Sequence, residues 1–394
     1  MIDLKKALPG LLFGAALCTL PALCSAAESA TTREYPYLYK SPRAMGMGGA
    51  YTSIGGTVDT LFYNPAGLSL MPKDKGWEVN ILNLSAEANN DGLNFYRDLQ
   101  SALDTGDLNG DGSATDDQQR AVNDLLYNYS GKYIHLRAAD FSSFGRSYDS
   151  LSFGMGALVS GRFDALPHQG FGPEGFLEVD ADMTTGALGG ISIPLSSRLS
   201  AGASLKYFHR ESVMHNFSAR EIVDSATDLN DLFYDDLRKK GSAVGFDAGA
   251  IWNIAPNSWW RPALGVSIMN IGDLDFGDAG TIPMTVNAGF SIRPRIEAFR
   301  SLLFAVDYVD IANNYTQDSD AAKRLRYGAE LQLFDRTAME LALRAGMYEG
   351  YPTAGLTFRF SVIALSYTFY SEEVGAYAGQ DRDKRQLLNL VIGW

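Results

Sequence analysis

The sequence predicts an all-β fold: a closed transmembrane barrel of about fourteen antiparallel strands, with the first part of the mature chain plugging its lumen. Three observations lead to this prediction. Apolar and polar side chains alternate along many segments, short and long connections alternate between these segments, and a glycine-rich stretch near the start has no strand pattern. Alternation with a period of two is typical of strands that have one apolar and one polar face.

The first 26 residues have the pattern of a secretory signal peptide. Two lysines precede an apolar run at 8–23, and small residues at 25–27 form the expected cleavage region. The alternative is a lipoprotein anchor at Cys18 or Cys24, but a leucine precedes each cysteine where a small residue is usual. Because both cysteines lie inside the signal, we expect no disulfide in the mature chain.

Residues 27–75 are predicted to be a hatch rather than part of the barrel wall. From Ser41 to Leu70 the chain is rich in glycine and nearly uncharged, and its apolar residues follow neither a helical nor a strand period. Asn64-Pro65 marks a turn. A segment of this kind needs a surrounding wall, and everything after Lys75 has the pattern of one.

The barrel is predicted over residues 76–394. Its candidate strands are 76–86, 131–143, 148–163, 176–193, 197–211, 241–253, 261–270, 281–293, 300–311, 324–333, 338–348, 351–360, 362–371 and 385–394. Connections after even-numbered strands are short. Those after odd-numbered strands are long, notably 87–130 and 212–240, and only Glu349-Gly350 breaks the rule. Outer-membrane barrels sort their turns and loops in this way, whereas the alternative, a soluble β-sandwich, has no reason to do so.

Composition and the last strand favour the outer membrane of a Gram-negative bacterium. The chain has 20 Tyr, 21 Phe and 40 Gly, and no apolar run after the signal is long enough for a membrane helix. The final strand alternates and ends on Trp394, while Trp259 and Trp260 lie in a predicted turn where an aromatic girdle is expected. The formal net charge of −13 and the absence of basic runs argue against nucleic acid as a partner.

The stretch from Pro42 to Leu68 resembles the N-terminal hatch of the FadL-type long-chain fatty acid transporters. The matching positions are Arg43, Gly46, Met47, Gly48, Gly49, Ala50, Phe62, Tyr63, Asn64, Pro65, Ala66 and Gly67. The resemblance implies a fourteen-stranded outer-membrane barrel that carries hydrophobic compounds inward. The C-terminal part, including Gly350-Tyr351-Pro352-Thr353, looks more similar to conjugal-transfer TraF-like relatives, and it leaves the cargo open.

The leading functional hypothesis is a channel for passive uptake of small hydrophobic molecules, fatty-acid-like or aromatic, gated by the hatch. The alternative is a barrel that does not transport but acts as an adaptor or shuttle for secreted, surface or conjugation proteins docked at its outer loops. Met side chains adapt to varied ligand shapes, and the glycines allow several backbone states. The candidate ligand and gate residues are Met45, Met47, Leu61, Phe62, Asn64 and Pro65, although static packing of the plug would use the same residues.

The segment Asp107–Gln118 resembles a calcium-binding loop. The candidate ligands are Asp107, Asn109, Asp111, Ser113 and Asp116, with Gly112 at the sharp turn. The last position holds Gln118 where a calcium loop has an acidic residue, so a solvated acidic loop is the alternative.

No enzymatic activity is predicted. His135, His168, His209 and His215 are scattered, and the sequence has neither a metal-binding histidine pattern nor a nucleophile elbow. By alternation, Lys206, Asp307, Glu340 and Arg344 face the lumen. We expect these residues to form charge networks that anchor the hatch.

Overall fold

The structure is a computed structural model. It describes residues 34–394 apart from 75, 105–115, 171–173, 226–236, 297–298, 316–319 and 337–338.

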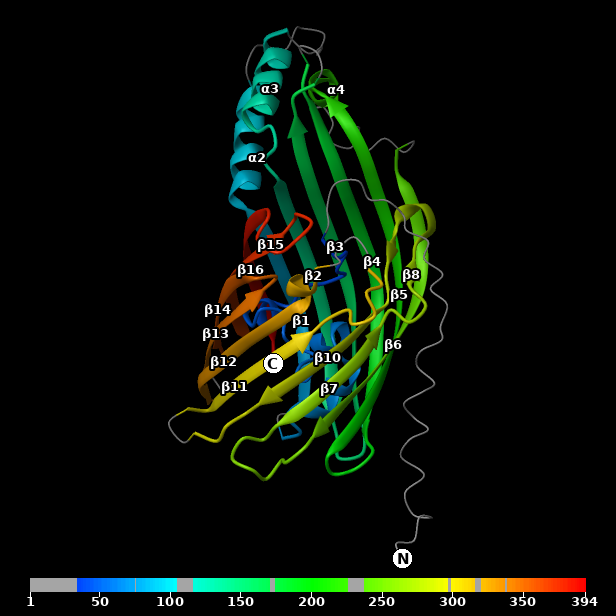
Figure 1. Ribbon diagram of the computed structural model, residues 1–394, viewed down its shortest axis with the longest axis vertical. Coiled ribbons are helices and arrows are strands. Elements are labelled where there is room, and N and C mark those ends of the chain that lie inside the picture. Colours follow the sequence, from blue (N-terminus) through cyan, green and yellow to red (C-terminus); the bar gives the residue numbers. More distant parts are fainter. Residues whose placement is uncertain are drawn as a thin grey trace, which may run out of the picture. The chain divides into compact units, whose positions relative to one another are not determined.

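Fourteen antiparallel strands form one closed barrel, in which β1 completes the ring by pairing with β16 (Figure 1). The first seven are β1 (Trp77–Asn89), β2 (Ile134–Ser147), β3 (Ser152–His168), β4 (Phe176–Pro194), β5 (Leu199–Ser218), β6 (Lys239–Asn253) and β7 (Ala263–Met269). The others are β10 (Thr285–Ile292), β11 (Ser301–Tyr308), β12 (Leu325–Arg336), β13 (Met339–Tyr348), β14 (Tyr351–Phe360), β15 (Ile363–Glu373) and β16 (Arg382–Gly393). Each predicted strand overlaps one of these, so the predicted fold is confirmed.

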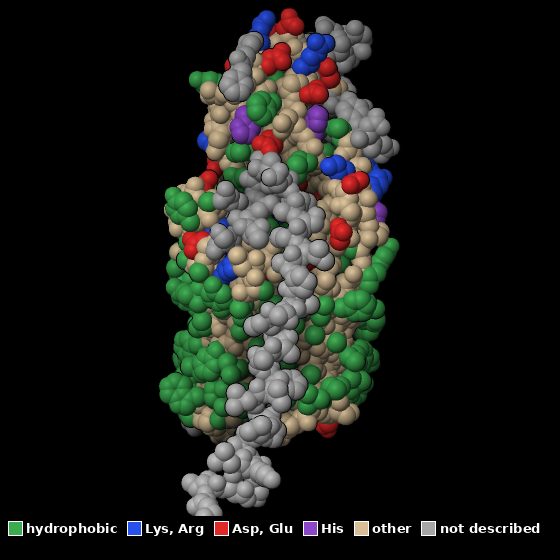
Figure 2. Space-filling view, turned by 45° about the vertical axis from the view of Figure 1, so that its right-hand side comes forward, with side chains coloured by type: hydrophobic (Ala, Val, Ile, Leu, Met, Phe, Trp, Pro, Cys, Tyr) green, Lys and Arg blue, Asp and Glu red, His purple; other side chains and the backbone are tan. Residues whose placement is uncertain are grey.

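A belt of exposed apolar side chains surrounds the half of the barrel that lies toward the short turns (Figure 2). Leu205, Val266 and Leu365 belong to it, and charged side chains gather toward the opposite end. Trp77, Trp252 and Trp394 are exposed and lie near the strand ends on the rim that carries the short turns, here called the turn rim. Trp259 and Trp260, predicted to belong to an aromatic girdle, are exposed in one of these turns. Membrane barrels carry an outward apolar band with aromatic borders of this kind.

The strands β2 to β5 extend beyond the rest of the barrel, and three helices cover this extension. These are α2 (Asn90–Leu103), α3 (Asp116–Asn128) and α4 (Ala219–Ser225). Their apolar residues form one buried cluster with Ile134, Ala165, Val179 and Phe217 of the strands. The pairing of β2 to β5 contains no register shift, so inward and outward side chains alternate without interruption along these strands. These four residues therefore lie on the outer face of the barrel, as the exposed residues lower in the same strands do.

The strand ends and connections differ from the prediction in several places. The expected loops 87–130 and 212–240 contain the ends of β1 and β5 and the helices α2, α3 and α4. The expected strand 281–293 begins in the barrel only at Thr285, because Thr281–Ile282 (β9) pairs instead with Leu274–Asp275 (β8) and Pro283 cannot donate to a ladder. None of the helices in the described part of the chain is long and apolar enough to cross a membrane.

Candidate functional site

Residues 34–74, here called the leading segment, run against the inward face of the barrel wall (Figure 1). Their regular pieces are short: α1 (Pro42–Gly46), η1 (Val58–Phe62) and η2 (Pro65–Leu70). Two prolines start α1 and η2, where a missing N–H costs nothing. No piece is longer than six residues, so the conformation of the segment is determined by the wall.

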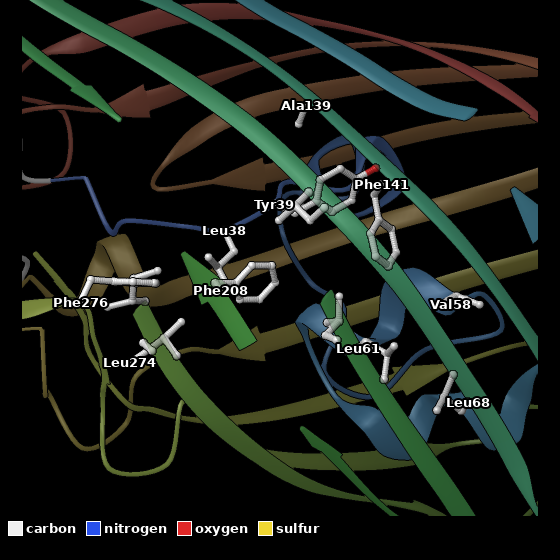
Figure 3. Close-up of a cluster of buried hydrophobic side chains, with 14 of the residues drawn as sticks. Leu38, Tyr39, Val58, Leu61, Leu68, Ala139, Phe141, Phe208, Leu274 and Phe276 are labelled. Carbon is white, nitrogen blue, oxygen red and sulfur yellow. The ribbon is translucent and has the colours of Figure 1, made fainter. Parts of the chain in front are cut away.

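An apolar cluster joins the leading segment to β2, β3, β4 and β5 (Figure 3). Val58, Leu61 and Leu68 are fully buried in it. The rings of Phe62 and Phe141 pack edge to face with centroids 4.8 Å apart, and Tyr39 lies 5.0 Å from the ring of Phe62. This cluster binds the segment on one side of the lumen by ordinary core packing.

Glycines of the wall allow the backbone of the leading segment to approach the strands directly. A Cβ at Gly202 would collide with the backbone of Ala66, one at Gly265 with Thr52, and one at Gly328 with the carbonyl of Met47. Gly48, on the segment itself, has φ +65° and faces the carbonyl oxygens of Met347 and Tyr327. The contact is therefore between backbones, with no side chain between them.

Replacing Gly48 with Ala is expected to destabilise the protein more than the same change at Gly131. Both glycines have positive φ, which costs an L-residue about 1–2 kcal/mol, but only at Gly48 would the new methyl meet the wall, since Gly131 has open space around it. The temperature at which the folded band converts on heated gels measures the difference. Equal shifts for the two variants would show that the close approach at Gly48 is not a constraint.

Asn64 is fully buried and ties the leading segment to itself and to the wall. Its side-chain oxygen accepts from the N–H of Ala66 at 3.0 Å. Its amide nitrogen donates to the carbonyls of Thr52 at 2.7 Å, Val266 at 3.2 Å and Ala250 at 3.3 Å. Since a buried polar group without partners is costly, these bonds position the turn after η1.

Ionic contacts with β11, β12 and β13 hold the other side of the leading segment. Glu330 accepts from Arg43 Nε at 2.8 Å and Nη2 at 2.7 Å, and from Arg344 Nε at 2.7 Å. Asp307 accepts from the backbone N–H groups of Tyr51 at 2.7 Å and Thr52 at 2.6 Å. Among the residues expected to anchor the hatch, Asp307 and Arg344 therefore take part in its attachment.

The other two residues of that group pair within the wall. Lys206 binds Asp247 at 2.7 Å and donates to the side chain of Asn270 at 2.6 Å. Glu340 lies 3.7 Å from Arg359 of β14 and accepts from Gln332 at 3.1 Å. Both pairs join neighbouring or nearby strands, so they contribute to the wall rather than to the contact with the leading segment.

A second buried network surrounds Lys40, near the start of the described chain. Its ammonium donates to Glu34 at 2.6 Å and to Glu372 at 3.0 Å. Arg385 binds Glu34 at 2.9 Å and Glu87 at 3.3 Å. Burial disfavours the charged form of Lys40, but the carboxylates of Glu34 and Glu372 outweigh burial and hold the pKa of Lys40 well above its usual value. The network thus joins the leading segment to β1, β15 and β16 through ion pairs.

A cavity of about 100 Å³ lies between the leading segment and the wall. Its apolar lining is largely aromatic and comprises Tyr35, Tyr37, Tyr39, Phe62, Tyr63, Tyr315 and Tyr348, with Leu38, Met45, Met269, Ile282 and Val309. The rest of the lining is polar and includes five basic side chains, Lys40, Lys206, Lys323, Arg324 and Arg326, with Asp310, Asn270 and Asn287. Apolar walls with convergent polar groups are typical of small-molecule sites. Met45 of α1 is among the lining residues, so the cavity borders this helix.

The structure divides the candidate ligand and gate residues into two groups. Met45 and Phe62 line the cavity. Met47 is buried among Ala44, Tyr51 and Ile54 and against β11. Leu61 is buried in the apolar cluster described above. Asn64 contacts the wall through its side-chain amide, and Pro65 contacts it through its backbone. A ligand-binding or gating role for the six residues stays a prediction.

The candidate calcium loop falls mostly outside the described residues. Asp107, Asn109, Asp111 and Ser113 are among those not described, while Asp116 begins α3. Gln118 donates from its side chain to the carbonyl of Leu103 at 2.7 Å, which joins α3 to the end of α2. Calcium binding stays a prediction, to be tested by calorimetry with millimolar calcium.

One histidine has an environment that the sequence did not indicate. His135 is fully buried, with Nδ1 2.5 Å from Asp164 and Nε2 2.9 Å from Glu87. These partners lie 29 and 48 residues away along the chain, so only the alternation of β1, β2 and β3 could have placed them on one inward face. In the described part of the chain, no group of three or more His, Cys, Asp or Glu residues could hold a metal ion.

Comparison with known proteins supports the architecture. No family model matches the sequence, and no curated protein matches it. Among solved structures, a deletion mutant of the monoaromatic hydrocarbon channel TodX is 15% identical, with a TM-score of 0.52 over 90% of this chain and 97% of that chain. The toluene transporter TbuX of Ralstonia pickettii is 12% identical, with a TM-score of 0.51 over 92% and 100%. At these identities the likeness shows the fold alone, and the predicted barrel fold is confirmed.

Proposed function

We propose that this protein is an outer-membrane channel for the passive uptake of small hydrophobic molecules, and that the leading segment is its hatch. The observation that carries the proposal is the arrangement of the lumen. A closed barrel with an outward apolar belt contains a segment of its own chain, and an aromatic cavity lies between that segment and the wall. The solved structures with this fold include a monoaromatic hydrocarbon channel and a toluene transporter.

In this proposal the ligand enters at the end that carries α2, α3 and α4 and binds in the aromatic cavity. Release toward the turn rim then requires the leading segment to shift. The contacts on its two sides differ in kind: apolar packing on β2 to β5, and on β11 to β13 ionic contacts beside a smaller apolar cluster. A shift that keeps one set and loosens the other would open a path without removing the hatch from the barrel.

Filling the cavity is expected to reduce uptake. In Val309→Trp a large ring replaces a cavity-lining side chain, and the matched control Val306→Trp puts the same ring on the exposed outer face of β11. Intact Gram-negative cells that lack their own hydrocarbon and fatty-acid channels are supplied with labelled toluene or oleate. The initial rate of uptake should fall strongly for Val309→Trp and stay unchanged for Val306→Trp.

The same experiment separates transport from the adaptor hypothesis. If the unaltered protein takes up neither compound above the level of cells without it, and purified protein carries no bound hydrophobic molecule in mass spectra, the transport proposal is wrong. A stoichiometric protein partner recovered from outer membranes would then support an adaptor. The buried contacts of the leading segment are compatible with both a channel and an adaptor. The uptake rate therefore distinguishes the two functions.

A further inference from the structure

A hollow of about 690 Å³ lies on the outer surface of the barrel, away from the lumen. Its floor is a patch of small residues on four adjacent strands: Ala86, Ala88, Ala138, Gly161 and Ala181. Ala86 pairs with Ala138, and Ala138 with Gly161, so these residues form one row across the sheet. We call this feature the outer hollow.

Alternation shows that the floor faces outward. Glu87, between Ala86 and Ala88, points into the lumen, where it contacts His135 and Arg385. Arg162, next to Gly161, binds Asp164 and Asp182 on the inward face. A Cβ built on Gly161 meets no atom within 4 Å, which agrees with open space above it.

The outer hollow continues directly into the apolar belt. Leu388 and Met183 stand at the two ends of the floor row, paired with Ala86 and Gly161, and are 58% and 52% exposed. Leu93 of α2 lines the hollow on the side away from the belt and is 53% exposed. A hydrogen bond of 2.9 Å from Gln386 of β16 to Asn90 holds the start of α2 beside this floor.

Water is a poor occupant of this space. The floor offers apolar side chains, and the backbone N–H and C=O groups of its strands are engaged in the antiparallel ladders on both sides. Glu211 and Arg238, which also line the hollow, form an ion pair at 3.2 Å. A buried water needs two to four polar partners, and cavities without them stay dry. An unfilled hollow would also leave its lining without dispersion contacts.

We propose that the outer hollow binds an acyl chain of a lipid from the surrounding membrane, held between the floor row and Leu93. The chain reaches the hollow from the apolar belt without crossing water. Because lipid tails are as apolar as the side chains they contact, close packing must favour this position, and the recess of small residues provides that packing. This inference depends on the membrane location given under the proposed function.

The test uses full-length protein in vesicles of phosphatidylcholine with or without bromine atoms on the acyl chains, which quench nearby tryptophan fluorescence. Leu93→Trp reports on the hollow, and Tyr96→Trp, exposed on the same helix outside it, is the matched control. Emission of the unaltered protein, whose five tryptophans all lie toward the turn rim, is subtracted. We expect bromine to quench Leu93→Trp strongly and Tyr96→Trp little.

A second substitution tests the floor. Gly161→Phe in the Leu93→Trp protein should remove most of the bromine quenching, whereas Gly161→Ala should retain it; Ala138→Phe repeats the test from the neighbouring strand. Quenching that survives both Phe variants, or is absent from Leu93→Trp, overturns the lipid site. If bromine fails to quench the native tryptophans, the membrane location itself is wrong.

Discussion

A variant without residues 34–74 is expected to form an open, ion-conducting pore, whereas the full chain should conduct little. Eight strands already enclose enough space for a small ligand, and barrels of sixteen or more leave an aqueous channel. The fourteen-stranded wall should therefore retain a wide lumen once the segment is gone. Single-channel recordings in planar bilayers measure the change, which should be a stepwise conductance present only in the deletion variant.

Conductance of the deletion variant similar to that of the full chain would show that wall side chains or outer loops close the lumen without the leading segment. If the deletion variant does not assemble, the Gly48→Ala protein tests whether the leading segment blocks conduction. In that protein the segment is present but cannot approach the wall as closely. That protein should show brief openings that Gly131→Ala does not.

Replacing Glu330 with Gln is expected to lower the free energy of unfolding by about 3–5 kcal/mol, the usual cost of breaking a buried ion pair. The Glu330 side chain is 9% exposed and accepts from both Arg43 and Arg344. Without its charge, two guanidinium groups face each other across a neutral amide. Urea titration of the folded barrel in detergent, followed by tryptophan emission, measures the loss.

The matched control is Glu340→Gln. Glu340 lies in the same part of the wall but is more exposed, and its contact with Arg359 is longer, at 3.7 Å. Partly exposed pairs contribute about 0–1 kcal/mol, so this variant should unfold close to the unaltered protein. Protease treatment adds a second measurement, since the leading segment should become cleavable in Glu330→Gln only. Equal stability of the two variants would contradict the anchoring role of Glu330.

The strands were predictable because the side chains on one face belong to the apolar belt and those on the other face point toward the lumen. Apolar and polar residues therefore alternate along each strand. Two predicted strands ended too early, in the region where the outward side chains do not belong to the belt. β3 and β5 continue to His168 and Ser218, beyond the expected ends at 163 and 211. There the outward side chains are buried under α2, α3 and α4, and these helices belong to connections that were predicted only as long loops.

For the candidate functional site, the sequence predicted which segment enters the lumen but not which wall residues it contacts. Local composition identified residues 27–75, but the partners of that segment lie far along the chain: Arg43 and Glu330 are 287 residues apart. A single sequence carries no signal for such a pair, nor for the small floor residues of the outer hollow, which are adjacent only through strand register. The similarity of the C-terminal part to conjugal-transfer proteins remains a prediction.

The attachment of the leading segment has a consequence for the order of assembly. The wall groups that receive it include Asp307, Glu330, Thr353 and Thr368, the last two donating to the carbonyls of Gly46 and Pro42. All four belong to the final quarter of the polypeptide, so the stretch from Pro42 to Thr52 obtains these partners late in synthesis. Until those late strands form, the stretch from Pro42 to Thr52 lacks these partners, whereas Val58, Leu61 and Leu68 can already pack on β2 to β5.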